Sequence, residues 1–337
     1  MKIRMGKLTD CFLSSYTKDG YKSFFADEAK GMRQVILLKG ASMQIRSKLY
    51  KVLAQIKAEE GCDVELLHQA QNANFLEGII LKKEAILLVD YAPEREGEKS
   101  SVFDLMGYLD QESYGVYEAK IKDLEEQIRV NLELLQENGS SLCHSLGQKC
   151  VMDEKEQQKI LHEMADEYFF SQKTQPHVRF AQGLDLKGRV NFYQEILKDI
   201  TTKQYLAGDN WADKSAVLEK LAQEAAKVGY YTTIYYDSWD GERAELLVVA
   251  EKKLALAAER LTADFSACRW SFKDPSGYRG EYSVDLKKLL DGVNRLQIVL
   301  EEIYNDILAE EYLSKAKENL TDLLKGYAAE VEEEKTV

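Results

Sequence analysis

The chain has 337 residues, 45% of them hydrophobic and 31% charged, a balance typical of globular proteins and enough chain for two sizeable cores. Its net charge of −13 argues against a broad nucleic-acid-binding surface, because phosphates would be repelled. We find no apolar run long enough for a signal peptide or a membrane span, and the five cysteines are dispersed. We therefore expect a cytoplasmic protein with reduced thiols and no membrane or nucleic-acid partner.

The first regular elements run from residue 34 to residue 89. The segment QVILLKG (34–40) predicts a buried strand that ends in a glycine turn, and residues 46–60 have helical apolar spacing up to Gly61. Further strands are predicted in DVELLH (63–68) and on both sides of a turn in LEGIILKKEAILLV (76–89). Strand, helix and strand form a βαβ unit, so this order predicts an α/β fold with a parallel sheet.

Two helices are expected to follow this unit as a hairpin packed on it. The first covers residues 113–138, and Asn138-Gly139-Ser140-Ser141 predicts its end. The second covers roughly residues 153–171. Apolar residues recur in the first helix at spacings of three and four, at Ile121, Leu124, Ile128, Leu132 and Leu135. Stripes of this kind usually pack inside their own protein, and partner binding through the helices is the alternative.

The same order of elements returns when the chain is shifted by 168 residues. Gly20 meets Gly188 (188 − 20 = 168), Gly61 meets Gly229, and Glu77 meets Glu245, all without a gap. Connections usually differ in length between unrelated units, so this match predicts a tandem duplication. Half A covers residues 1–172, with its helical hairpin at about 113–172. Half B covers residues 173–337, with its hairpin at about 284–332, and His177 and Arg179 are assigned to the linker before its repeat.

Each half has a degraded phosphate-binding loop between its first strand and helix. An intact loop has the pattern G-x-x-x-x-G-K-[ST], in which backbone amides and Lys hold phosphate and the hydroxyl binds Mg²⁺. In half B, Gly208, Lys214 and Ser215 keep this spacing, but Asp213 replaces the second glycine. An Asp there adds a negative charge facing an anion, although it also suits a helix N-cap.

The loop of half A departs further from the pattern. Gly40 and Ser47 remain, but Ile45 replaces the second glycine and Arg46 replaces the Lys. A β-branched residue fits a positive-φ backbone poorly, and Arg differs from Lys in shape and reach.

The acid that would hold Mg²⁺ is present in only one half. Asp90 ends the apolar strand AILLVD of half A, whereas Ala258 takes the equivalent position in half B, with Glu259 one residue later. The half with the better loop therefore lacks the aligned acid. A composite site of Lys214 or Ser215 with Asp90 is one hypothesis, and simple decay of both sites is the other.

These features resemble an uncharacterised bacterial family of tandem P-loop ATPase-like proteins. The resemblance rests on the two loops, on Leu67-His68 after a strand, and on Asp90-Tyr91-Ala92-Pro93, and it spans most of the chain. It implies two fused P-loop NTPase halves that bind ATP with Mg²⁺. The departures fall on the loops themselves, so the implied ATP binding does not carry over directly.

The sequence thus predicts a pseudo-ATPase that binds an unidentified protein partner and holds nucleotide weakly, if at all, in half B. The first alternative is an active ATPase or kinase-like enzyme that uses Lys214 and Ser215, with Asp90 or Glu259 for the metal. The second is a structural protein that acts through its helical hairpins. No residue is assigned a catalytic role.

Overall fold

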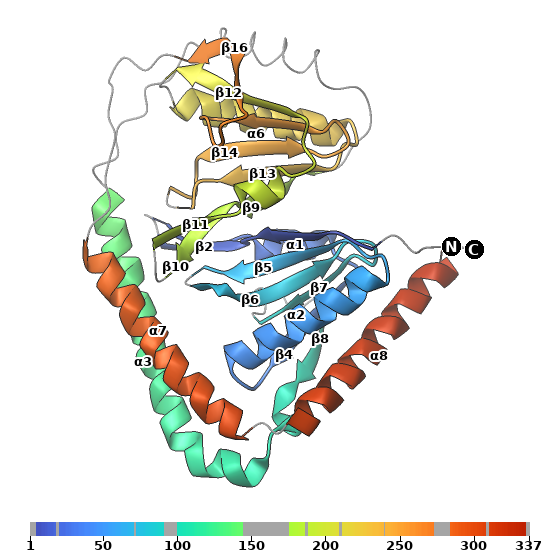
Figure 1. Cartoon of the computed structure of the whole chain (residues 1–337), viewed down its shortest axis with the longest axis vertical. Coiled ribbons are helices and arrows are strands. Elements are labelled where there is room, and N and C mark those ends of the chain that lie inside the picture. The colour runs from blue at the N-terminus through green and yellow to red at the C-terminus, as the bar shows by residue number, and fades with distance from the viewer. Residues whose placement is uncertain are drawn as a thin grey trace.

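The computed structural model describes residues 5–17, 20–70, 72–90, 100–143, 175–185, 188–208, 211–238, 240–272, 284–307 and 310–334. Two sheets lie one above the other, with helices on their outer faces and along their sides (Figure 1). Within this described part, no helix is long and apolar enough to cross a membrane.

The first sheet belongs to half A and has the strand order β1-β5-β6-β7-β4-β8. Its helix α2 (Met43–Glu59) packs on the outer face, and the 3₁₀ helix η1 (Leu105–Tyr108) follows its last strand. A hairpin and α1 (Phe25–Gly31) precede the central strand. The strands are β1 (Leu8–Cys11), β2 (Ser14–Thr17), β3 (Gly20–Ser23), β4 (Gln34–Lys39), β5 (Val64–Gln69), β6 (Asn72–Leu81), β7 (Ile86–Val89) and β8 (Ser100–Asp104).

The second sheet belongs to half B and repeats this order as β9-β13-β14-β15-β12-β16. Its outer helix is α6 (Trp211–Lys227), which is α2 shifted by 168 residues at both ends, and α5 (Tyr193–Ile196) takes the place of α1. The predicted duplication is confirmed, because it holds for every strand of the sheet. The strands are β9 (His177–Phe180), β10 (Gln182–Asp185), β11 (Gly188–Asn191), β12 (Thr202–Gly208), β13 (Thr232–Tyr236), β14 (Ala244–Val249), β15 (Leu254–Ala257) and β16 (Ser266–Phe272).

The α/β class is confirmed, but both sheets are mixed and not parallel. β6 runs antiparallel to β5 and β7, and β14 runs antiparallel to β13 and β15, while the remaining pairs are parallel. The reason is the short turn after β6 and β14, since a connection of four residues joins only antiparallel neighbours. Ala85 and Lys253 occupy equivalent places in these turns, with φ of 52° and 49°.

Each sheet is covered on both faces, so its central strands are almost continuously apolar. In β4, Ile36 and Leu38 face α2, whereas Val35 and Leu37 face the other half. The same alternation in β14 directs Leu247 toward α6 and Leu246 toward half A. The inner faces of the two sheets therefore form one shared core between the halves.

The two halves meet about a pseudo-two-fold axis. Phe12 and Phe180 are equivalent residues (180 − 12 = 168), and their backbones exchange two hydrogen bonds of 3.0 and 2.8 Å. Phe12 stacks on Phe192 and Phe180 stacks on Phe24, which are again equivalent pairs, with ring centroids 5.2 and 4.9 Å apart. Self-matching contacts of this kind are the signature of a two-fold interface, here within one chain.

The helices after each sheet depart from the predicted hairpins. α3 (Gln111–Cys143) continues through Asn138-Gly139-Ser140-Ser141, where an end was predicted. A glycine inside a helix costs only about 1 kcal/mol relative to alanine, so packing against a neighbouring helix can outweigh it. That neighbour is α7 (Val284–Ile307), which lies along α3 (Figure 1). The helix predicted at 153–171 lies outside the described residues.

The helices α7 and α8 (Glu310–Glu334) pack on half A, although they belong to half B in sequence. They diverge from each other and do not form a hairpin (Figure 1). Gln44 Nε2 at the start of α2 donates to the Gln297 carbonyl of α7 at 2.9 Å, and Asn319 of α8 donates to the Tyr108 hydroxyl at 2.7 Å. Half A therefore depends on the end of the chain for its core. The α7 and α8 side chains buried there are Leu300, Ile303, Tyr304, Ala316, Leu320 and Leu324.

Candidate functional site

The loop–helix junction of half B is closed by its own lysine. Lys214 is 3% exposed, and its Nζ donates to the carbonyls of Gly208 and Ala258, the latter at 2.9 Å. Ala258 is the residue that replaces the metal-binding acid. The lysine thus spans from the loop to the neighbouring strand end, where a bound phosphate and metal would lie in an active P-loop protein.

The junction of half A is closed in the same way by Arg46. Its Nη1 donates to the carbonyls of Gly40 and Ala41 at 3.1 and 2.7 Å, and its Nε lies 2.9 Å from Asp90 Oδ1. Tyr50, one turn further along α2, donates to the same carboxylate oxygen at 2.8 Å. The acid and the cation retained in half A therefore neutralise each other.

The hydroxyls of the two motifs tie each helix to its sheet. Ser47 Oγ accepts the backbone N–H of Leu76 at 2.8 Å, and Ser215 Oγ accepts the backbone N–H of Ala244 at 2.8 Å. The two acceptor positions and the two donor positions are each 168 residues apart (215 − 47 and 244 − 76). A structural bond preserved in both halves explains why the serines remain after the rest of the motif has changed.

The first glycine of half A also has a packing role. Gly40 has a φ of +73°, and a side chain on it would lie 2.8 Å from the Met106 backbone nitrogen and 2.9 Å from Asp104 Oδ1. Only glycine accepts both the left-handed backbone and this close approach. Here η1 occupies the space beside the loop, so Gly40 is required whether or not a phosphate binds.

The helices begin earlier than an intact motif requires. α2 starts at Met43 and α6 at Trp211, two residues before the positions of the missing glycines, Ile45 and Asp213. In half A the Ile45 amide is capped by Ser42 Oγ at 3.3 Å, and the Arg46 amide donates to the Ser42 carbonyl at 3.1 Å. Both amides are thus used by the helix itself, which removes them from a phosphate cradle.

The structure does not bring Ser215 and Asp90 together, so it does not assemble the composite magnesium site. α2 and α6 lie on opposite outer faces of the two stacked sheets (Figure 1), and Asp90 bonds only to α2 among its described partners. Across the described parts of the chain, no three His, Cys, Asp or Glu side chains gather as a metal site would require.

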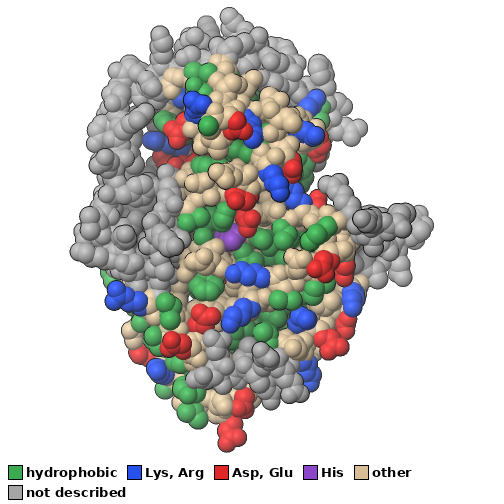
Figure 2. Space-filling view, viewed as in Figure 1, with side chains coloured by type: hydrophobic (Ala, Val, Ile, Leu, Met, Phe, Trp, Pro, Cys, Tyr) green, Lys and Arg blue, Asp and Glu red, His purple; other side chains and the backbone are tan. Residues whose placement is uncertain are grey.

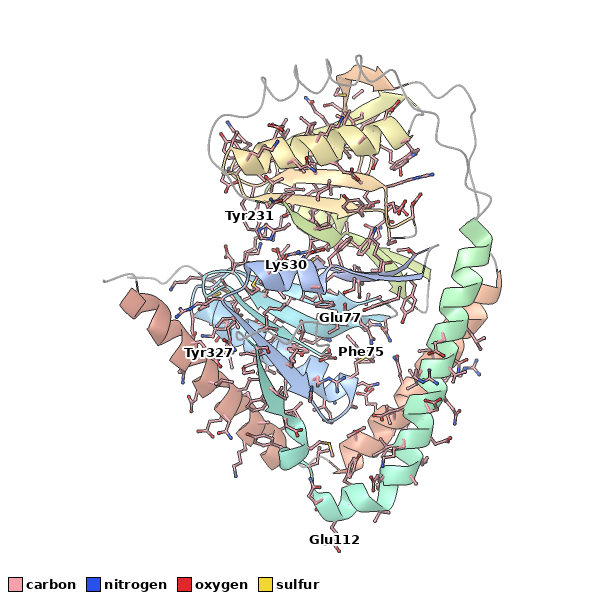
Figure 3. The ribbon with its side chains drawn as sticks, turned by 180° about the vertical axis from the view of Figure 1, so that it is seen from behind. Lys30, Phe75, Glu77, Glu112, Tyr231 and Tyr327 are labelled. Atoms are coloured by element: carbon pink, nitrogen blue, oxygen red, sulfur yellow. The ribbon has the colours of Figure 1, made fainter. Side chains whose placement is uncertain are left out.

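Beside Asp90 lies a second buried carboxyl, Glu77 of β6, which is seen at the end of the first sheet in Figure 3. Its Oε1 accepts a hydrogen bond of 2.6 Å from Ser14. Burial raises the pKa of Glu77 to about 8, helped by the Asp90 charge and opposed by the Ser14 hydroxyl. Burial likewise raises the pKa of Asp90, against the opposing influence of Arg46 and Tyr50.

Replacing Glu77 with glutamine is expected to flatten the dependence of stability on pH. The native state holds the Glu77 proton up to about pH 8, whereas an unfolded glutamate releases it near pH 4.5. Between these values the native state binds more protons, so this residue makes stability fall as pH rises. Thermal unfolding from pH 5 to 9 should show Glu77→Gln losing less stability than the wild type. A constant difference between the two, with exposed Glu118→Gln as control, would contradict this.

The sequence did not identify Tyr50, Glu77 or Ser14 as part of the site. One signal was present: Glu77 matches Glu245 in the repeat. The structure shows why, since Gln182 Nε2 donates to Glu245 Oε2 at 2.5 Å just as Ser14 donates to Glu77. Positions 14 and 182 are equivalent, so each half keeps one polar contact to a buried glutamate. Neither Ser14 nor Gln182 belonged to a pattern that sequence periodicity could pick out.

Taken together, each motif residue that both halves retain has a structural partner of its own. On the face shown in Figure 2, described acidic and basic side chains are interspersed without a broad basic area, in keeping with the expected absence of nucleic-acid binding. The resemblance to tandem P-loop proteins stays a prediction from the sequence. Comparison with protein-family models, with curated proteins and with solved structures finds no match to this chain.

Proposed function

We propose that this protein is a non-hydrolysing, P-loop-like scaffold that acts in the cytoplasm by binding a protein partner. One observation supports this most directly: the cation of each motif is bound by the chain's own loop. Lys214 donates to two backbone carbonyls, and Arg46 donates to two carbonyls and pairs with Asp90. A nucleotide would have to displace these contacts, and breaking buried hydrogen bonds offsets the affinity gained.

The proposal also explains which residues survive in the two motifs. A loop that only decays would lose its Lys and Ser as readily as its glycine. Here the retained serines and cations fasten α2 and α6 to the sheets in both halves. Their role is therefore to hold the outer helices in place, and the surface built on those helices is what the protein presents to a partner.

Thermal unfolding with and without Mg²⁺–ATP tests the proposal. A nucleotide at a hundred times its Kd would add about 2.7 kcal/mol of stability, so we expect no shift in Tm at millimolar Mg²⁺–ATP and no phosphate release. Lys214→Ala should lower Tm without nucleotide, because two buried carbonyls lose their donor at a cost of about 1–3 kcal/mol. Lys214→Met serves as the control that keeps the side-chain volume.

The opposite pattern would establish the enzyme alternative. In that case Mg²⁺–ATP raises Tm, Lys214→Ala abolishes the rise, and the wild type releases phosphate steadily. Ser215→Ala would then reduce nucleotide affinity, whereas under the proposal it lowers stability alone through the lost bond to the Ala244 amide.

A further inference from the structure

A buried cluster of charges lies between the halves and breaks their pseudo-symmetry. Arg179 of β9 is 1% exposed, and it pairs with Glu65 of β5 and Glu28 of α1, at 2.7 Å in each case. Lys82 adds a contact of 2.8 Å to Glu65, and its Nζ lies 4.7 Å from the ring centroid of Tyr231. Figure 3 shows Tyr231 at the boundary between the two sheets.

The equivalent positions on the other side of the axis carry no such charges. Cys11 stands where half B has Arg179, Ile196 stands where half A has Glu28, and Thr233 stands where half A has Glu65 (179 − 11, 196 − 28 and 233 − 65 are all 168). All three are buried, with exposed fractions of 1%, 5% and 5%. The cation is thus contributed by half B alone and both acids by half A alone.

The electrostatics show that these groups remain ionised together. Burial alone would raise the pKa of Glu28, but the Arg179 guanidinium outweighs it and lowers the pKa to about 2. The same competition lowers the pKa of Glu65, where Lys82 also contributes. Each charge therefore depends on the presence of its partner from the other half.

We propose that this Arg179–Glu28–Glu65 cluster determines which halves can pair, allowing half A with half B and excluding like with like. The shared core is built of equivalent contacts, so its shape alone fits two copies of half A as well as one of each. In a pairing of two A halves, Glu28 and Glu65 face a thiol in place of Arg179. In a pairing of two B halves, Arg179 faces Ile196 and Thr233.

Either mismatch leaves buried charges without partners. Breaking a buried pair costs about 3–5 kcal/mol, whereas replacing all its members by apolar groups is often neutral. A cluster with these properties adds specificity through the penalty on wrong partners. It directs the chain to fold on itself and keeps the duplicated surfaces of different chains from associating.

The full-length chain allows a direct test, because each half supplies the residues that mimic the wrong partner. Arg179→Cys recreates the environment of an A–A pairing, and Glu28→Ile with Glu65→Thr and Lys82→Ala recreates that of a B–B pairing. Under reducing conditions we expect each one-sided variant to lower Tm by about 5 °C or more. Combining all four substitutions should restore Tm to within about 3 °C of the wild type.

The combined variant separates specificity from simple stabilisation. If the cluster only stabilises the fold, the combined variant is at least as unstable as the one-sided variants, and the proposal is overturned. It is also overturned if the one-sided variants unfold at the wild-type temperature. Should a one-sided variant fail to fold, recovery of a folded, monomeric combined variant still supports the proposal, and failure of that variant rejects it.

Discussion

Leu320→Ala is expected to destabilise half A by about 2–5 kcal/mol, although Leu320 lies at the far end of the chain. Its side chain is fully buried in the core around α2, together with Leu324 of the same helix. Removing it leaves a cavity beside α2 that the neighbouring side chains fill only in part. The loss is therefore expected in half A first, even though the substitution is in half B by sequence.

Hydrogen exchange measured by mass spectrometry can locate that loss. Peptides from α2 and β6 should lose protection in Leu320→Ala, while peptides from α6 keep theirs. Leu221→Ala is the matched control, because Leu221 is fully buried under α6 and belongs to the core of half B. It should have the reverse effect. Loss of protection in α6 but not α2 after Leu320→Ala would contradict the exchanged packing of the closing helices.

The local elements of this fold could be predicted because their signals are local. Alternating apolar residues gave the strands of both sheets, and Gly61 and Gly229, both with a φ of 87°, mark the ends of α2 and α6 as predicted. The offset of 168 then placed the elements of one half on those of the other. Even the mixed sheet was encoded, since the turn before Ile86 is too short for a parallel connection.

Contacts between the halves could not be predicted in this way. Arg179 was assigned to a linker, because a lone arginine beside a histidine carries no periodic signal, yet it is among the most deeply buried side chains. Its partners Glu28 and Glu65 lie 151 and 114 residues away. The packing of α7 and α8 on half A is equally invisible to the repeat, which predicts equivalent elements but not which copy they cover.

The candidate site was predicted in its residues but not in its geometry. The sequence identified Gly40, Arg46, Asp90 and Lys214, and all of them lie at the two junctions. Their spacing alone could not show that each cation turns onto its own loop. That outcome depends on where the helix begins and on η1, which fills the space beside Gly40.

Phe12→Ala and Phe180→Ala should give similar losses of stability, about 3–5 kcal/mol each. Both side chains are fully buried on the pseudo-two-fold axis, and each stacks on the equivalent phenylalanine of the other half. The shared core means that damage on one side weakens both halves. A single cooperative transition at a lower temperature is therefore expected for either variant.

Tryptophan fluorescence provides a test that needs no label. The three tryptophans, at positions 211, 239 and 270, all lie in half B, so their signal follows that half alone. Phe12→Ala changes half A, yet it should lower the unfolding temperature reported by tryptophan as much as Phe180→Ala does. Leu53→Ala, in the outer core of half A, is the control for damage away from the interface. If Phe12→Ala leaves the tryptophan transition in place while circular dichroism shows half A unfolding, the halves are stable independently and the shared core does not couple them.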